Sequence, residues 1–488
     1  MSERRVTARE ALASLTDDFT ELPTPERDHA PDGPLAWHGY DTSRARAAER
    51  TGEEESVVWG RAVIGGTAAV LISFEFGFLG GSLGERTGDR LQAAYGHARA
   101  HRLPVVSLVA TGGSRMQEGM RALSQLQRVA RESALTAAAG LPRIAVLRDP
   151  TTGGGWATLG AGADIVLALP DAQVGFAGSR VRPPDADPAA YTAESQLAAG
   201  SIDAVVPAPA LRRVLALYLT LLTTPSTTPA PPPHALPEGP RPSRGAGNCA
   251  TGPHPPVAAV QPNPPPQKAP LPTTGWEAVQ RARSPRRPRA ETYLDAYFTR
   301  RAPLQGDRAG GTDPGMLCGF GEHEGRTVAY AAQCGTATRP AGYRTAARLI
   351  RLADRLGIPV LTLVDTPGAA NNAAAEREAA GPAIADLFTA VATARTPLTT
   401  LLIGEGGSGG ALALAAPGNT WATPDSYFSV IAPELAAAIL KRPEELVRAT
   451  ADELRVRPQD LVELGVVRGV VGELARQGAE PATTRPPD

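Results

Sequence analysis

Glycines recur in this 488-residue chain where short runs of β-branched and aliphatic residues end. Four such segments are 111–119, 151–155, 365–368 and 404–410. Glycine between a strand and a helix leaves backbone N–H groups open to a ligand oxygen, because no Cβ blocks the approach. Two such turns could converge on one oxygen and form an oxyanion hole from main-chain donors. Tight helix–strand packing explains most isolated glycine pairs, but four clusters favour a functional role.

The four glycine segments contain no histidine, cysteine or lysine that could act as nucleophile or base. Asp365 and Glu405 are candidates for acid–base work, but each stands where a helix N-terminus also favours a negative charge. We therefore expect both carboxylates to cap helices. Oriented amides without a protein base suit the formation of an enolate from a thioester, if the substrate or cofactor supplies the base.

The two halves of the chain carry related sequences. Residues 103–113 match residues 358–368 at an offset of 255, and the same offset aligns 153–155 with 408–410. A register held over roughly 70 residues with at most one gap indicates an internal duplication.

Each repeat alternates buried strands with helices. We expect strands at 105–109 and 144–147 in the first repeat and at 360–364 and 401–403 in the second, each followed by a glycine turn. Repeated strand–turn–helix units build right-handed superstructure, so the sequence predicts an α/β fold in duplicate.

Composition divides the chain into five segments. We expect a loosely packed polar leader over 1–55 and two folded domains over 56–223 and 291–475, separated by a Pro-rich linker. That linker, 224–290, holds 19 of the 47 prolines and is expected to be extended because it has few apolar residues. The last residues, 476–488, are expected to form a disordered tail.

Overall charge and cysteine content exclude several classes of protein. The chain has 49 Lys+Arg against 50 Asp+Glu, which argues against nucleic-acid binding. No apolar run is long enough for a membrane span and no signal-peptide core follows Met1, so we expect a cytoplasmic protein. The three cysteines have no metal-ligand spacing, so no metal site is predicted.

Longer motifs carry a resemblance to a known enzyme. The segments 78–84 (FLGGSLG), 111–119 (TGGSRMQEG), 149–154 (DPTTGG) and 175–178 (GFAG) resemble the beta subunit of bacterial acetyl-CoA carboxylase carboxyltransferase. The second half resembles the alpha subunit of the same enzyme, in the segments 306–308 (GDR), 342–344 (GYR), 365–369 (DTPGA), 404–411 (GEGGSGGA) and 429–434 (SVIAPE). The chain therefore looks like a beta–alpha fusion.

This resemblance implies two tandem crotonase-like ββα-spiral domains and transfer of a carboxyl group from carboxybiotin to the α-carbon of acetyl-CoA or a short acyl-CoA, giving malonyl-CoA from acetyl-CoA. The beta-like half would stabilise the thioester enolate, and the alpha-like half would stabilise the ureido oxygen of biotin. By similarity, the first hole is assigned to Gly112, Gly113, Gly153 and Gly154, and the second to Gly406, Gly407, Gly409 and Gly410. The substrate-binding residues implied are Gly80, Gly81, Ser82, Arg115, Phe176, Ala177, Gly178, Thr366, Pro367 and Gly368.

The resemblance also implies partners. Carboxybiotin would come on a separate biotin carboxyl carrier protein, loaded by a separate biotin carboxylase subunit, and the chain would form a homodimer or higher even oligomer with shared sites. The family's zinc ribbon is not expected, because residues 1–55 contain no cysteine. Two alternatives remain open: a biotin-independent decarboxylase, hydratase or isomerase of the crotonase fold, and a non-catalytic carboxylase subunit. Against a hydratase, Glu118 stands alone near its glycine turn, without a second glutamate.

Overall fold

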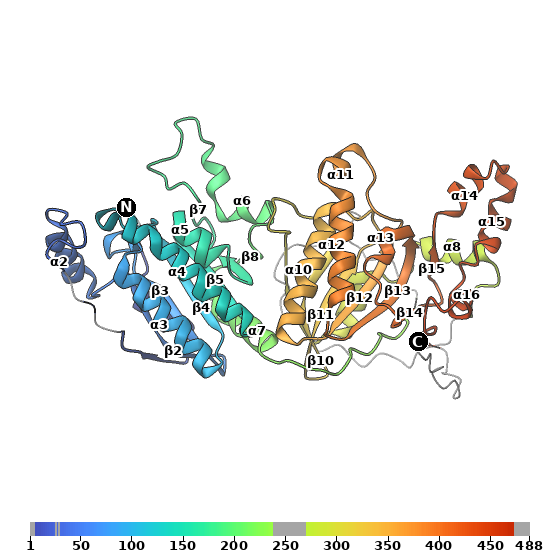
Figure 1. Ribbon diagram of the computed structural model, residues 1–488. Coiled ribbons are helices and arrows are strands. Elements are labelled where there is room, and N and C mark those ends of the chain that lie inside the picture. Colours follow the sequence, from blue (N-terminus) through green and yellow to red (C-terminus); the bar gives the residue numbers. More distant parts are fainter. Residues whose placement is uncertain (1–4, 25–26, 28–29, 238–269, 473–488) are drawn as a thin grey trace, which may run out of the picture.

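Two α/β halves lie side by side in the computed structural model, which describes residues 5–24, 27, 30–237 and 270–472 (Figure 1). The elements of the first half are α1 (Ala8–Leu15), β1 (Asp18–Glu21), α2 (Tyr40–Thr51), β2 (Val57–Ile64), β3 (Thr67–Phe74), α3 (Glu85–His101), β4 (Val105–Thr111), α4 (Gly119–Ala138), β5 (Arg143–Thr152), α5 (Gly153–Gly155), β6 (Ile165–Ala168), β7 (Val174–Gly175), α6 (Ala193–Ala198), β8 (Ala204–Val205) and α7 (Ala208–Leu222).

The elements of the second half follow a similar order. They are α8 (Gly275–Arg283), α9 (Ala290–Tyr297), β9 (Arg300–Pro303), β10 (Met316–His323), β11 (Arg326–Gln333), α10 (Pro340–Leu356), β12 (Val360–Thr366), α11 (Ala373–Arg377), α12 (Ala380–Thr393), β13 (Leu398–Gly407), α13 (Ser408–Leu412), β14 (Thr420–Ala422), β15 (Tyr427–Ser429), α14 (Pro433–Ile439), α15 (Val447–Glu453) and α16 (Pro458–Glu463).

The two sheets confirm the duplication. Among the described residues, the first sheet has the order β1-β2-β3-β4-β5-β6-β8 and the second β14-β13-β12-β11-β10-β9. In chain order, each sheet starts with antiparallel strands (β1–β3 and β9–β11) and continues with parallel ones. The β4–β5 and β12–β13 pairs shift register at positions 255 residues apart. The central strands β4 and β12 are buried along their whole length, as parallel strands covered on both faces must be.

The leader is packed, contrary to expectation. Helix α1 buries four apolar residues, Ala8, Ala11, Leu12 and Leu15, against the first sheet, and β1 pairs with β2. The polar composition of residues 1–55 concealed this because α1 is amphipathic and needs only one apolar face.

The expected linker is also shorter than predicted. At its start, Tyr297 donates a hydrogen bond to the carbonyl of Pro231 and Thr399 to that of Ala230. At its end, α8 buries Ala278, Val279 and Ala282 beside α15. Both ends of 224–290 therefore belong to the second half, while 238–269 and the expected tail 476–488 lie outside the described residues.

Charged pairs and a continuous apolar core join the halves. Helix α7 packs its apolar face against β9 and β10. The fully buried Asp203 of the first half accepts hydrogen bonds from Arg308 (2.5 Å) and Arg348 (3.3 Å) of the second. Asp164 pairs in the same way with Arg355, at 2.6 Å. These contacts fix the two halves relative to each other within one chain.

Candidate active site: paired glycine turns

The first glycine turn follows β4, and its amides form hydrogen bonds within the protein. The Gly112 N–H donates to the Gly80 carbonyl (2.9 Å), and the Gly113 N–H donates to Thr111 Oγ1 (3.0 Å). Gly113 has φ +109°, a conformation that side chains rarely adopt. The loop after β3 also needs glycine, because a Cβ on Gly81 would overlap the Ala110 carbonyl.

The second turn of this half follows β5 and forms the start of α5. The Gly153 N–H donates to the Phe176 carbonyl (3.0 Å). Gly154 and Gly155 are first-turn amides, which have no intrahelical acceptor, and no hydrogen bond of the described residues uses them. Gly112, Gly113 and Gly153 were expected to supply the hole, but their N–H groups already have acceptors. The amides without an acceptor among the described residues are those of Gly154 and Gly155, and both glycines are buried.

The second half repeats this arrangement. The Gly368 N–H donates to Thr366 Oγ1 (3.1 Å), as Gly113 does to Thr111. Gly406 and Gly407 are buried strand residues of β13 that pair with β15, so they shape the strand end. Gly409 and Gly410 occupy the first turn of α13 and correspond to Gly154 and Gly155 at the offset of 255.

The remaining predicted site residues lie in the loops around these turns. Phe176 is 74 % exposed and lies beside α5 together with half-buried Ala177 and Gly178. Pro367 is exposed, whereas Thr366 is buried and bonds within its own turn. The structure thus brings the predicted loops to the carboxyl end of each sheet. No ligand contact tests their roles, which stay predictions.

Arg115 and Ser82 were expected to bind substrate, but they face inward. The Arg115 side chain is 1 % exposed and forms an ion pair with Glu55. Its guanidinium also donates to Tyr40 Oη (3.2 Å) and to the Ser82 carbonyl (2.8 Å). Because Glu55 and Tyr40 belong to the leader, sequence reasoning could not find this partner set. Arg115 binds the 80–84 loop from inside the protein, through the Ser82 carbonyl, and its side chain does not reach the surface.

The Glu55–Arg115 pair should make stability depend on acid pH. Burial raises the pKa of Glu55, but the charge and hydrogen bonds of Arg115 outweigh this effect and lower the pKa to about 2. The unfolded value is about 4.3, so the stabilisation is complete above about pH 4.3 and is lost as the pH falls toward 2. Between pH 6 and pH 3 the wild type should lose about 2 kcal/mol through this group, and Glu55→Gln should lose none of it.

Urea denaturation at both pH values measures this difference. Glu54→Gln is the matched control, because the neighbouring Glu54 is 82 % exposed and only weakly paired with Arg90. Equal acid-induced losses in wild type and Glu55→Gln would contradict the prediction.

Two arginines from the expected linker form ion pairs with carboxylates beside the glycine turns of the second half. Arg287 Nη2 donates to Asp365 Oδ1 (2.5 Å), and both side chains are almost fully buried. Arg283 Nε donates to Glu405 Oε1 (3.0 Å). The capping roles expected for Asp365 and Glu405 are therefore wrong: both carboxylates pair with arginines at the strand ends. Sequence reasoning missed Arg283 and Arg287 because they lie in a Pro-rich segment.

Removing Arg287 should destabilise the second half strongly. Loss of one partner of a buried ion pair typically costs about 3–5 kcal/mol. Asp365 would keep a second partner, Arg289 Nη1 at 3.2 Å, so the lower end of this range applies. We expect Arg287→Met to lower the free energy of unfolding by this amount, measured by urea denaturation. An exposed arginine of the same half supplies the control, since Arg377→Met on α11 should change the free energy by less than about 1 kcal/mol. Similar values for the two variants would refute the role given to Arg287.

Exposed apolar side chains lie on the segments that follow the glycine turns in the sequence. In the first half they are Met116, Met120, Leu123, Phe176 and Val181. In the second half they are Leu412, Val430, Leu435, Ile439 and Leu440. Large apolar residues gathered around a site are typical of a surface that another protein covers.

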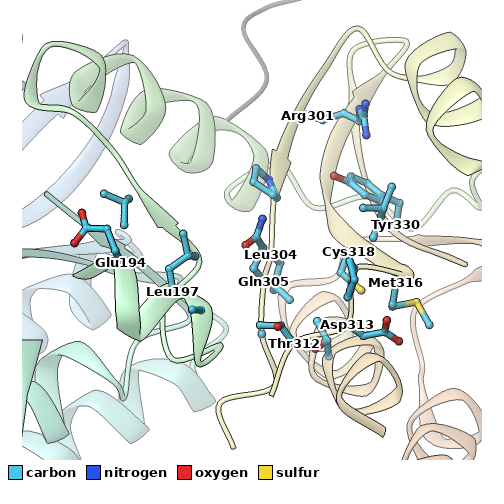
Figure 2. Close-up of a pocket in the computed structure, with 17 residues that line it drawn as sticks. Glu194, Leu197, Arg301, Leu304, Gln305, Thr312, Asp313, Met316, Cys318 and Tyr330 are labelled. Carbon is cyan, nitrogen blue, oxygen red and sulfur yellow. The ribbon is translucent and has the colours of Figure 1, made fainter. Parts of the chain in front are cut away.

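A cavity of about 480 Å³ lies elsewhere, between the two halves (Figure 2). Glu194 and Leu197 of the first half line one side, and Arg301, Cys318 and Tyr330 of the second half line the other. None of its lining residues belongs to a glycine turn, so this cavity is separate from the candidate site.

The described residues contain no helix with the length and hydropathy of a membrane span. In the same part of the chain, no three histidine, cysteine or acidic side chains group as metal ligands would.

Comparison with known proteins first defines the class. Residues 36–205 match the carboxyl transferase domain family, and residues 271–485 match the acetyl co-enzyme A carboxylase carboxyltransferase-like family. Transcarboxylase 12S, described as a hexamer with hydrolysed methylmalonyl-coenzyme A bound, shares the fold with a TM-score of 0.72 and 21% identity over 95% of this chain and 86% of its own. The chain thus has the tandem crotonase-like fold of a two-domain carboxyltransferase.

Relatives then identify the family. The acetyl-coenzyme A carboxylase carboxyl transferase subunits beta/alpha of Salinispora arenicola are 38% identical, covering 96% of this chain and 83% of that protein. The "Probable biotin-dependent acyl-coenzyme A carboxylase beta3 subunit" of Mycobacterium bovis is 32% identical, covering 91% and 85%. The chain belongs to the acetyl-CoA carboxylase carboxyltransferase family, in the form that fuses beta and alpha subunits.

Proposed function

We propose that this protein transfers the carboxyl group of carboxybiotin, carried on a separate biotin carboxyl carrier protein, to the α-carbon of acetyl-CoA or a short acyl-CoA. The observation that supports this best is the repeated turn. Each half has a helix start whose first amides have no hydrogen-bond acceptor among the described residues, and the two starts are at equivalent positions. Malonyl-CoA is the product expected from acetyl-CoA.

In the first half, the Gly154 and Gly155 amides would donate to the thioester oxygen as it becomes an enolate. Such donors act where charge develops, and the loss of one costs about 2.7–4 kcal/mol of barrier. In the second half, the Gly409 and Gly410 amides would donate to the ureido oxygen of biotin. Carboxybiotin supplies the CO2 and, after releasing it, the base.

The carboxylates near the turns favour amide chemistry over a protein base. Glu118 accepts hydrogen bonds from Tyr40 and the Glu85 N–H, and Asp365 and Glu405 pair with arginines. Each is therefore occupied in holding structure. This argues against a hydratase, which needs a free carboxylate beside the hole.

The two holes belong to different sheets of one chain, and α10 and α12 lie between α5 and α13 (Figure 1). A reacting thioester and carboxybiotin must approach within a few ångströms, about 3–3.5 Å at the reacting atoms. We propose that each active site pairs the first half of one chain with the second half of another, in a homodimer or higher even oligomer. The exposed apolar side chains on the segments that follow the turns would supply this interface. A biotin carboxylase subunit completes the reaction cycle by reloading the carrier.

Purified protein incubated with acetyl-CoA and a ¹⁴C-carboxylated carrier tests the proposal. Labelled malonyl-CoA should form, and its formation should require both substrates. Carrier-independent decarboxylation of malonyl-CoA would favour a decarboxylase instead. If neither reaction occurs while the chain binds the carrier and the biotin carboxylase, the chain is a non-catalytic subunit.

A further inference from the structure

An arginine-lined pocket of about 260 Å³ lies in the first half, beside the start of α3. We propose that this pocket binds a phosphate group of the CoA portion of the substrate, an inference that rests on the proposed function. Its charged lining residues are Arg27, Arg44, Arg86, Arg121, Glu85 and Glu118. Four positive charges therefore face two negative ones. Several guanidinium groups converging on one concave site are the arrangement that recognises phosphate.

The two acids are already engaged. Glu85 Oε1 accepts from Arg27 (3.3 Å) and from Arg121 (3.4 Å). Glu118 Oε1 accepts from Tyr40 (2.5 Å), and its other oxygen accepts from the Glu85 N–H (2.6 Å). Two of the lining arginines are therefore engaged with acids, because Arg27 also donates to Asp89 (2.6 Å). Arg86 carries a positive charge that none of these acids neutralises.

Arg86 is the arginine most available to a ligand. It is half-buried on α3, and it makes no hydrogen bond or ion pair with any residue that the structure describes. A half-buried guanidinium without an anion is unfavourable, and a phosphate would supply the missing charge.

The pocket is connected through the 80–84 loop and the Gly112–Gly113 turn to the turn after β5, at which the thioester is proposed to bind. The two turns touch, since a Cβ on Gly153 would lie 3.2 Å from Gly113 Cα. The 80–84 loop connects the pocket to the first turn: the Gly80 carbonyl accepts from Gly112, the Leu83 N–H donates to the Gly113 carbonyl (2.9 Å), and Arg86 follows three residues later. In CoA, about thirteen bonds separate the thioester sulfur from the nearest phosphorus, as many as four to five residues of extended backbone, or about 15 Å. A thioester at the turn can therefore place a phosphate in the pocket.

This assignment gives the leader a role in binding. Arg27 precedes α2 and Arg44 belongs to it, so two of the four arginines come from residues 1–55. The leader would thereby contribute to acyl-CoA affinity as well as to the packing of the first sheet.

Isothermal titration of the full chain with CoA tests the proposal without requiring carboxyl transfer. Arg86→Gln should raise the Kd for CoA about tenfold, and Arg121→Gln about threefold because this side chain is more exposed and shared with Glu85. Arg86→Lys should recover part of the affinity. Arg213→Gln is the matched control, since Arg213 is an exposed arginine on α7 outside the pocket.

Two further ligands identify the phosphate. If the 3′-phosphate occupies the pocket, 3′-dephospho-CoA should bind wild type and Arg86→Gln equally weakly. If the diphosphate occupies it, dephospho-CoA should still distinguish the two proteins, and pantetheine should not. Wild-type affinity for CoA in an Arg86→Gln/Arg121→Gln double variant would overturn the pocket assignment alone. Failure of the wild type to bind CoA at all would overturn the proposed function with it.

Discussion

Replacing Gly409 with valine should lower carboxyl transfer by about 10²-fold or more while leaving the fold intact. A Cβ at Gly409 meets no atom within 4 Å, and its φ is not positive, so the folded chain has room for the side chain. The added methyl groups would enter the space in which the ureido oxygen of biotin must approach the amides. Steady-state transfer from a carboxylated carrier to acetyl-CoA measures the loss, and thermal unfolding should shift little.

Gly96→Val is the matched control for this variant. Gly96 lies on α3, also has no atom within 4 Å of a Cβ, and belongs to none of the glycine turns. Valine there should affect the helix only through propensity, by less than about 1 kcal/mol, with transfer unchanged. Wild-type transfer by Gly409→Val would remove Gly409 from the proposed hole, and equal losses in both variants would show a general effect on folding.

Mixing two inactive variants should restore activity if sites are shared between chains. A Gly154→Val chain has a damaged first hole and an intact second hole, and a Gly409→Val chain has the reverse. Dissociating and reassociating an equal mixture makes half of the dimers mixed, and each mixed dimer has one site that combines two intact holes. About a quarter of wild-type activity should therefore return.

Valine at Gly154 must displace the end of the Leu126 side chain, so thermal unfolding of that variant should be checked before mixing. If both holes of a site came from the same chain, no mixture would contain an intact site and activity would stay at background. A wild-type monomer that is fully active at nanomolar concentration would contradict sharing independently.

The sequence determined the fold to a large extent. The strands around 105–109 and 360–364, the turns that follow them and the duplication at an offset of 255 are all present in the structure. These features depend on local patterns, namely continuous apolar runs and glycine at strand ends. Long motifs that match one family in the same order are specific for that family. The family membership could therefore be predicted from residues alone.

Tertiary structure decided which amides lack a hydrogen-bond acceptor and where the charged groups lie. The Gly112 and Gly153 N–H groups donate to the carbonyls of Gly80 and Phe176. No local sequence pattern predicts these two hydrogen bonds. Arg115 is buried because Glu55, 60 residues away, supplies its counter-charge, and Arg287 folds onto Asp365 from a segment whose prolines predicted a linker. Residue types and spacing specify strands, turns and helices because these form through near neighbours, whereas burial and pairing depend on which distant segments the fold brings into contact.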